Sequence, residues 1–177
     1  MVIGIDPGVT NCGIAKYIPE TKTLIQYTGN AYDIQRVISS FVPGAITLAV
    51  MEDVNEDSPV FLLPPKATMS VKLMIAQKLG KCKAIQLVLQ QQLEHLGIPI
   101  ELIAPSRRRR VPAATNLKIE VGPYLQAYAY PTKTTAEQFA YLMGIYGVTL
   151  NNPKQSPFGT EHSRDAAMLL QKYFQSK

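Results

Sequence analysis

Four side chains could bind a cation or move a proton. Each is expected at the edge of the hydrophobic core, at the end of an apolar run or at the start of a helix. Asp6 ends a short apolar run, and a Pro-Gly pair turns the chain directly after it. Glu52 ends a second apolar run. His162 and Asp165 are three residues apart at the start of a C-terminal amphipathic stretch, so they share one helix face.

Oxygen ligands with one imidazole suit Mg²⁺ or Mn²⁺, and two such ions can clamp the attacking and leaving oxygens of a phosphoryl transfer. A cation would also explain why carboxylates stand together, since without one they raise each other's pKa. Taken singly, each residue also has a structural role: a turn Asp, a strand-end Glu, or a polar residue at a helix start. The four converge if the first and fourth strands are neighbours and the last helix packs across them.

The hydrophobic pattern predicts an α/β fold with antiparallel strands first. We expect strands over 2–6, 12–17, 24–28, 46–51 and 98–103, and helices over 33–41, 66–96, 134–146 and 161–174. The long helix carries one apolar stripe, made of Ile75, Leu79, Cys82, Ile85, Leu89, Leu93 and Leu96. The last helix is expected to face inward with Ala166, Leu169, Leu170 and Phe174.

Composition is typical of a soluble globular domain, with 46% hydrophobic and 18% charged residues, and we expect one domain over residues 1–177. No apolar run approaches the length of a membrane span, so no membrane association is expected. Cys12 and Cys82 lack metal-type spacing and are expected to be reduced thiols. With no secretory signal in the first residues, these thiols predict a cytoplasmic protein.

Positive charge is concentrated in the middle third of the chain. Residues 61–118 hold ten Lys or Arg against two acidic residues, a net charge of +8, so the remainder carries −3 of the total +5. Such segregation indicates a polyanion partner such as nucleic acid. The alternative is a solvated helix face followed by a charged loop.

Five ordered motifs resemble the RuvC family of Holliday-junction resolvases: GIDPG, VMED, KLGKCKAI, IPIELIAPS and HSRDAA. They span nearly the whole chain. The resemblance implies an RNase H-like fold with a mixed central sheet flanked by helices. It also implies a metal-dependent endonuclease that nicks opposing strands of a four-way DNA junction symmetrically in recombination or repair, leaving 5′-phosphate and 3′-hydroxyl ends.

The same resemblance implies Asp6, Glu52 and Asp165 as metal-binding carboxylates, with His162 as a fourth ligand or a proton-transfer group. Two Mg²⁺ ions per site are expected, with Mn²⁺ as a substitute. The implied partners are branched DNA, a second copy of the chain in a homodimer, and a branch-migration motor. The resemblance implies DNA contacts by the KLGKCKAI helix, with Lys78, Lys81 and Lys83, and by Lys133. From the charge pattern we add Lys72 of the same helix and the run Arg107, Arg108, Arg109 and Arg110, which forms either a phosphate-contacting or a solvated loop.

The chain departs from the compact family pattern between Glu52 and Lys78, where Phe61 is the candidate for an aromatic wedge at the junction. Two other functions stay open. GIDPGVTNCGIA resembles the first phosphate motif of actin-like and sugar-kinase ATP-binding proteins, although that fold needs two such domains. A catalytically silent DNA-binding module of the same fold is the third interpretation.

Overall fold

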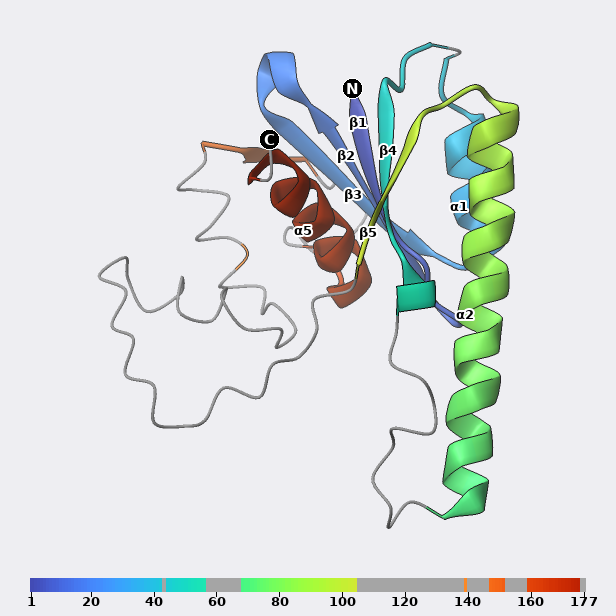
Figure 1. Ribbon diagram of the computed structural model, residues 1–177. Helices are drawn as coiled ribbons and strands as arrows, with labels where there is room; N and C mark the ends of the chain where they lie inside the picture. Colours follow the sequence, from blue (N-terminus) through green and yellow to red (C-terminus); the bar gives the residue numbers. More distant parts are fainter. Residues whose placement is uncertain (43, 57–67, 105–138, 140–146, 152–158, 176–177) are drawn as a thin grey trace, which may run out of the picture.

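A six-stranded mixed sheet forms the centre of the molecule in the computed structural model, which describes residues 1–42, 44–56, 68–104, 139, 147–151 and 159–175 (Figure 1). The strand order is β5-β4-β1-β2-β3-β6. The first three strands are antiparallel, whereas β4 runs parallel to β1, β5 to β4 and β6 to β3. The strands are β1 (Val2–Asp6), β2 (Cys12–Ile18), β3 (Thr23–Gly29), β4 (Leu48–Glu52), β5 (Ile100–Ile103) and β6 (Thr149–Leu150).

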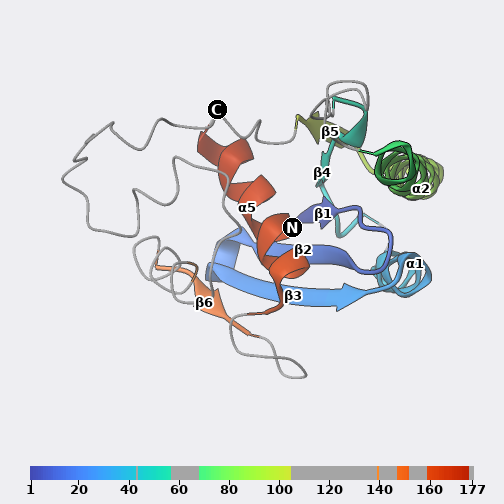
Figure 2. The same ribbon diagram turned by 90° about the horizontal axis from the view of Figure 1, so that it is seen from below.

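Helices cover both faces of the sheet. Helix α5 (Glu161–Gln175) lies on one face, and α1 (Ala31–Ser39) and α2 (Met69–His95) lie on the other (Figure 2). Two short 3-10 turns, η1 (Pro19–Thr21) and η2 (Val54–Glu56), connect elements. The predicted α/β class, with antiparallel first strands in a mixed sheet between helices, is confirmed. No helix in these ranges is long and apolar enough to cross a membrane.

Alternation along β1 divides the core into two layers. Ile3 and Ile5 are buried with residues of α1 and α2, whereas Val2 is buried in the cluster that includes α5. Because side chains alternate across a strand, Gly4 and Asp6 share the α5 face with Val2. The acidic end of β1 therefore points toward α5.

Glycine at two strand positions lets α5 approach the sheet closely. A Cβ added at Gly4 would overlap the carbonyl oxygen of Ala166 and stand 3.0 Å from Leu170 Cγ. A Cβ added at Gly13, on the neighbouring strand, would overlap the carbonyl oxygen of His162. The backbone of α5 thus packs against the backbone of β1 and β2, which fixes the height of the helix above the sheet.

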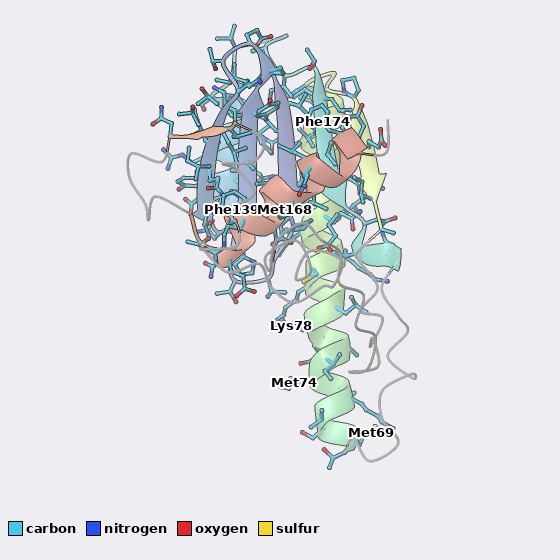
Figure 3. The ribbon with its side chains drawn as sticks, turned by 90° about the vertical axis from the view of Figure 1, so that its left-hand side faces the viewer. Met69, Met74, Lys78, Phe139, Met168 and Phe174 are labelled. Carbon is cyan, nitrogen blue, oxygen red and sulfur yellow. The ribbon has the colours of Figure 1, made fainter. Side chains whose placement is uncertain are left out.

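The long helix differs from its sequence prediction in how much of it is buried. It begins at Met69 after the N-cap Thr68 rather than at residue 66, and only Gln86, Leu89 and Leu93 are buried. Leu96, expected inward, is 46% exposed. Leu96 is the C-cap residue, at the very end of the helix. Ile75 and Leu79 are only half-buried, because the first half of α2 extends beyond the sheet and only the second half crosses it (Figure 3).

Smaller corrections concern element ends. Helix α1 begins at Ala31 because Asn30 and Asp33 form a capping box, and β4 includes Glu52. Phe174 was expected inward but is 46% exposed, with its ring edge-on to Tyr17. Strand β6 was not anticipated, because two residues are too short to show a periodicity. Of the helix expected over 134–146, only the buried Phe139 lies within the described residues, so that helix stays a prediction.

Replacing Gly4 with alanine tests the close packing of α5. The added methyl group would push against the backbone of Ala166, so we expect the free energy of unfolding to fall by about 1–3 kcal/mol. Gly80→Ala is the matched control, because a Cβ there meets nothing within 4 Å; this change inside α2 should stabilise by about 0.5–1 kcal/mol. Urea unfolding followed by circular dichroism measures both. Unchanged stability of Gly4→Ala would contradict the packing.

Candidate active site

Asp6 and Glu52 end two neighbouring strands on the same side of the sheet. Strands β1 and β4 are parallel, with Ile5 opposite Met51, so the next residue of each strand is the acidic one. Val50 belongs to the buried cluster on the α5 face, and alternation places Glu52 on that face as well. Asp6 is 9% exposed and Glu52 is half-buried. The two strand ends are therefore neighbours, as expected, and the register of the sheet places Asp6 beside Glu52.

The start of α5 is held in place by hydroxyl groups. The Thr160 N–H donates to Ser163 Oγ at 2.9 Å, and Ser163 Oγ donates to the Thr160 carbonyl at 3.0 Å. The hydroxyls of Thr160 and Thr28 are hydrogen-bonded to each other, which ties this turn to β3. The helix therefore begins at a defined place above the end of the sheet, with His162 and Asp165 in its first two turns.

His162 contacts Asp6 directly. Its Nδ1 lies 3.1 Å from Asp6 Oδ2, and the two side chains are 36% and 12% exposed. The hydrogen bond with Asp6 raises the pKa of His162, partly offset by burial. Because Asp6 occupies Nδ1, the other ring nitrogen, Nε2, is left for a ligand or for proton transfer.

The carboxyl group of Asp165 lies in a buried and negatively charged environment. Burial, followed by the negative charges of Asp6 and Glu161, raises the pKa of Asp165 to about 6. The positive charges of His162 and Arg164 lower it in part. Asp6 and Asp165 are therefore close enough to repel each other, and a bound cation would relieve that repulsion.

The four predicted residues lie at one end of the sheet, but their side chains are not arranged to coordinate one ion together. Within the described ranges, no three His, Cys, Asp or Glu side chains form a group that could hold a metal ion as they stand. The donor set still fits a hard divalent cation, because it offers carboxylate oxygens, one imidazole and an excess of negative charge. Metal binding would require side chains of this cluster to move closer together.

The predicted DNA-contacting residues are only partly described. Lys78 and Lys81 are exposed, and Lys72 and Lys83 are half-buried; all four lie on α2 between residues 72 and 83. The other predicted contacts and the wedge candidate lie outside the described residues: Phe61, Arg107, Arg108, Arg109, Arg110 and Lys133.

Two structural features near this end of the sheet were missed from the sequence. The close packing of α5 on glycine needs the tertiary arrangement, so only the small residues themselves were visible. Gln86 was visible in principle, because 79, 82, 86, 89 and 93 follow the three-four spacing of a buried helix face. Gln86 was not assigned to the buried face, because only apolar residues were counted and glutamine is usually exposed.

Three solved structures are similar to this chain over nearly its whole length. T. thermophilus RuvC in complex with a Holliday junction substrate is 16% identical, with a TM-score of 0.49 over 99% of this chain and 94% of that one. A second Thermus thermophilus RuvC structure is 16% identical, with a TM-score of 0.47 over 99% and 95%. Fowlpox virus resolvase in complex with its substrate Holliday junction DNA is 12% identical, with a TM-score of 0.46 over 100% of both chains. Neither a family model nor a curated protein matches the chain.

The raised pKa of Asp165 predicts how stability depends on pH. A carboxyl whose pKa is about 6 when folded and 3.8 otherwise holds its proton more tightly in the folded state, so stability falls as pH rises between these values. Without metal, Asp165→Asn should remove this fall. At pH 7.5 the variant should be more stable than wild type by on the order of 1–2 kcal/mol, after allowing for solvent screening.

Urea unfolding in EDTA at pH 4 and pH 7.5 measures the effect. Glu20→Gln removes an exposed carboxylate on η1 and controls for the loss of one charge. If the free energy of unfolding changed with pH equally in wild type and Asp165→Asn, the raised pKa of Asp165 would be contradicted.

Proposed function

We propose that this protein is a divalent-metal-dependent endonuclease that resolves four-way DNA junctions. The observation that carries the proposal is the meeting of Asp6, at the end of β1, with His162 and Asp165 from the first turns of α5. Glu52 ends the adjacent parallel strand on the same face. Buried acidic groups arranged at the end of a sheet suit phosphodiester hydrolysis, and the ordered motifs resembling RuvC specify the substrate class.

In this proposal, Asp6, Glu52 and Asp165 hold Mg²⁺ or Mn²⁺, two ions per site. When bound, the metal activates water and neutralises charge on the phosphate, which favours hydrolysis to 5′-phosphate and 3′-hydroxyl ends. His162 is oriented by its contact with Asp6 and acts as a fourth ligand or moves a proton through Nε2. The glycine contacts of α5 keep these groups at the height that the site requires.

The first half of α2 is the proposed DNA-contacting surface. It extends beyond the sheet, and Lys78 lies on this extension (Figure 3). Four lysines within twelve residues, with no acidic residue among them, suit the phosphates of a DNA backbone. This surface supplies affinity without sequence preference, whereas the acidic cluster supplies the chemistry.

A second copy of the chain is part of the proposal. Large apolar side chains are exposed along α2, and Leu73 and Met74 are 56% and 62% exposed. Met69, Leu87 and Val88 add to the same helix, which is apolar around much of its circumference. Such a helix is usually covered by protein, and a homodimer would bring two sites to opposing strands of one junction.

Charges placed on this helix should separate the dimer. The double variant Leu73→Glu/Met74→Glu is expected to sediment as a monomer, because two carboxylates would be desolvated in the interface. Thr21→Glu, on the exposed turn η1 and outside α2, is the control and should remain dimeric. Analytical ultracentrifugation distinguishes the species. A monomeric wild type, or a double variant that stays dimeric, would contradict the proposed dimer.

Cleavage of a synthetic four-way junction tests the central activity. Wild type in Mg²⁺ should release nicked duplexes, and Asp6→Asn or Glu52→Gln should lower the rate by more than about a hundredfold, because each removes a charged metal ligand. Asp33→Asn is a matched control, since this carboxylate caps α1 and Asn retains the acceptor oxygen. Its activity should equal that of wild type.

Other outcomes separate the competing functions. Tight junction binding without cleavage in any divalent metal would support a silent DNA-binding module. Stabilisation by ATP without junction binding would support the actin-like interpretation.

The proposal also includes a cytoplasmic location and a branch-migration motor that works on the same junction. Cys12 and Cys82 form no disulfide, which is consistent with a reducing compartment.

A further inference from the structure

Gln86 is a buried polar side chain on the face of α2 that packs toward the sheet. It is 1% exposed, and its neighbours along that face, Leu89 and Leu93, are fully buried aliphatic residues. An amide in such a place is unfavourable unless its polar atoms are hydrogen-bonded. An aliphatic residue would pack there without that requirement, so the function of Gln86 must lie in the bonds it makes.

Both ends of the Gln86 amide bind the chain immediately after Glu52. The Val54 N–H donates to Gln86 Oε1 at 2.9 Å, and Gln86 Nε2 donates to Asp53 Oδ1 at 3.3 Å. A backbone N–H can only donate and a carboxylate oxygen can only accept, so these partners determine the orientation of the amide. Only glutamine or an equivalent donor-acceptor group satisfies both partners.

The same short segment is held from its other side by β5. The Asp53 N–H donates to the Ile103 carbonyl at 2.9 Å, and Asp53 Oδ1 also accepts from the Asn55 N–H at 3.0 Å. With Gln86 added, the turn that leaves β4 is bonded to both β5 and α2. The direction in which the chain leaves Glu52 is therefore determined.

We propose that Gln86 is a positioning residue for Glu52 and sets the affinity of the acidic cluster for its divalent metal. Gln86 keeps the turn after Glu52 in one conformation. It also engages the neighbouring carboxylate of Asp53, so that Glu52 is the acid presented beside Asp6. The inference rests on the proposed function, because it assigns Glu52 to the metal site.

The geometry also links two parts of the proposed enzyme. Lys83 lies one helical turn before Gln86 on α2, so the helix that carries the DNA-contacting lysines is bonded directly to the strand end that carries Glu52. A shift of α2 on DNA binding would be transmitted to the chain that follows Glu52.

Manganese binding measured by isothermal titration calorimetry, without DNA, tests the assignment. Gln86→Met keeps the length of the side chain and removes both bonds, so we expect Mn²⁺ affinity to fall about tenfold or more, as for other residues that orient metal ligands. Affinity for a four-way junction in EDTA should stay within about twofold of wild type, because the lysines are untouched.

Gln92→Met is the matched control. Gln92 also lies on α2, and its Nε2 donates to the Gln35 carbonyl and to Ser39 Oγ of α1, each at 2.8 Å. Its loss removes two anchoring bonds of the same helix, made to α1 and not to the turn after Glu52. Mn²⁺ affinity should stay within about twofold of wild type. An equal loss in both variants would show general loosening of α2 and would overturn the positioning role.

A second pair of variants, Gln86→Glu alone and together with Asp53→Asn, tests the same role if Gln86→Met does not fold. Gln86→Glu retains an acceptor for the Val54 N–H but places a second carboxylate against Asp53, so Mn²⁺ affinity should fall about tenfold. Adding Asp53→Asn removes the second carboxylate and offers an amide donor to the new one, while the bond from the Asn55 N–H is lost, so part of the affinity should return. No recovery, or wild-type affinity in Gln86→Met, would overturn the inference. Failure of wild type to bind Mn²⁺, or equal binding by Asp6→Asn, would instead contradict the proposed function.

Discussion

The site depends on the backbone contact between α5 and the first two strands. Gly4 and Gly13 leave no side chain between the sheet and the helix, so the carbonyls of Ala166 and His162 lie directly on the strands. This places the first turns of α5 low over the end of β1, where His162 reaches Asp6. A larger residue at either of these two positions would raise the helix and separate the acidic and imidazole groups.

The electrostatics of the cluster follow from that contact. Burial together with the charge of Asp6 raises the pKa of Asp165 to about 6, an unfavourable arrangement for a protein without a cation. The two halves of α2 differ in what they contact. The second half packs on the sheet and holds the turn after Glu52 through Gln86, whereas the first half extends into solvent with lysines and exposed apolar residues.

Much of this arrangement could be predicted because it follows from local patterns. The apolar runs ending at Asp6 and Glu52 identify strand ends, and the spacing of His162 and Asp165 identifies a helix face. Tertiary effects were not predictable from the same patterns. Burial along α2 stops where the sheet ends, and Phe174 stays half outside although its spacing matches Leu170. Gln86 fits the spacing of the buried face but was missed because glutamine is usually exposed, and the partners that satisfy its amide lie 33 and 32 residues away in sequence.

The most direct measurement is the anomalous scattering of manganese in crystals of the wild-type protein. The account predicts a peak at the end of β1, with carboxylate oxygens of Asp6 and at least one of Glu52 and Asp165 at about 2.0–2.2 Å, and no such peak in Asp6→Asn crystals. Manganese bound only elsewhere, or unchanged at this place in the variant, would contradict the assignment of this sheet end as a metal-dependent active site.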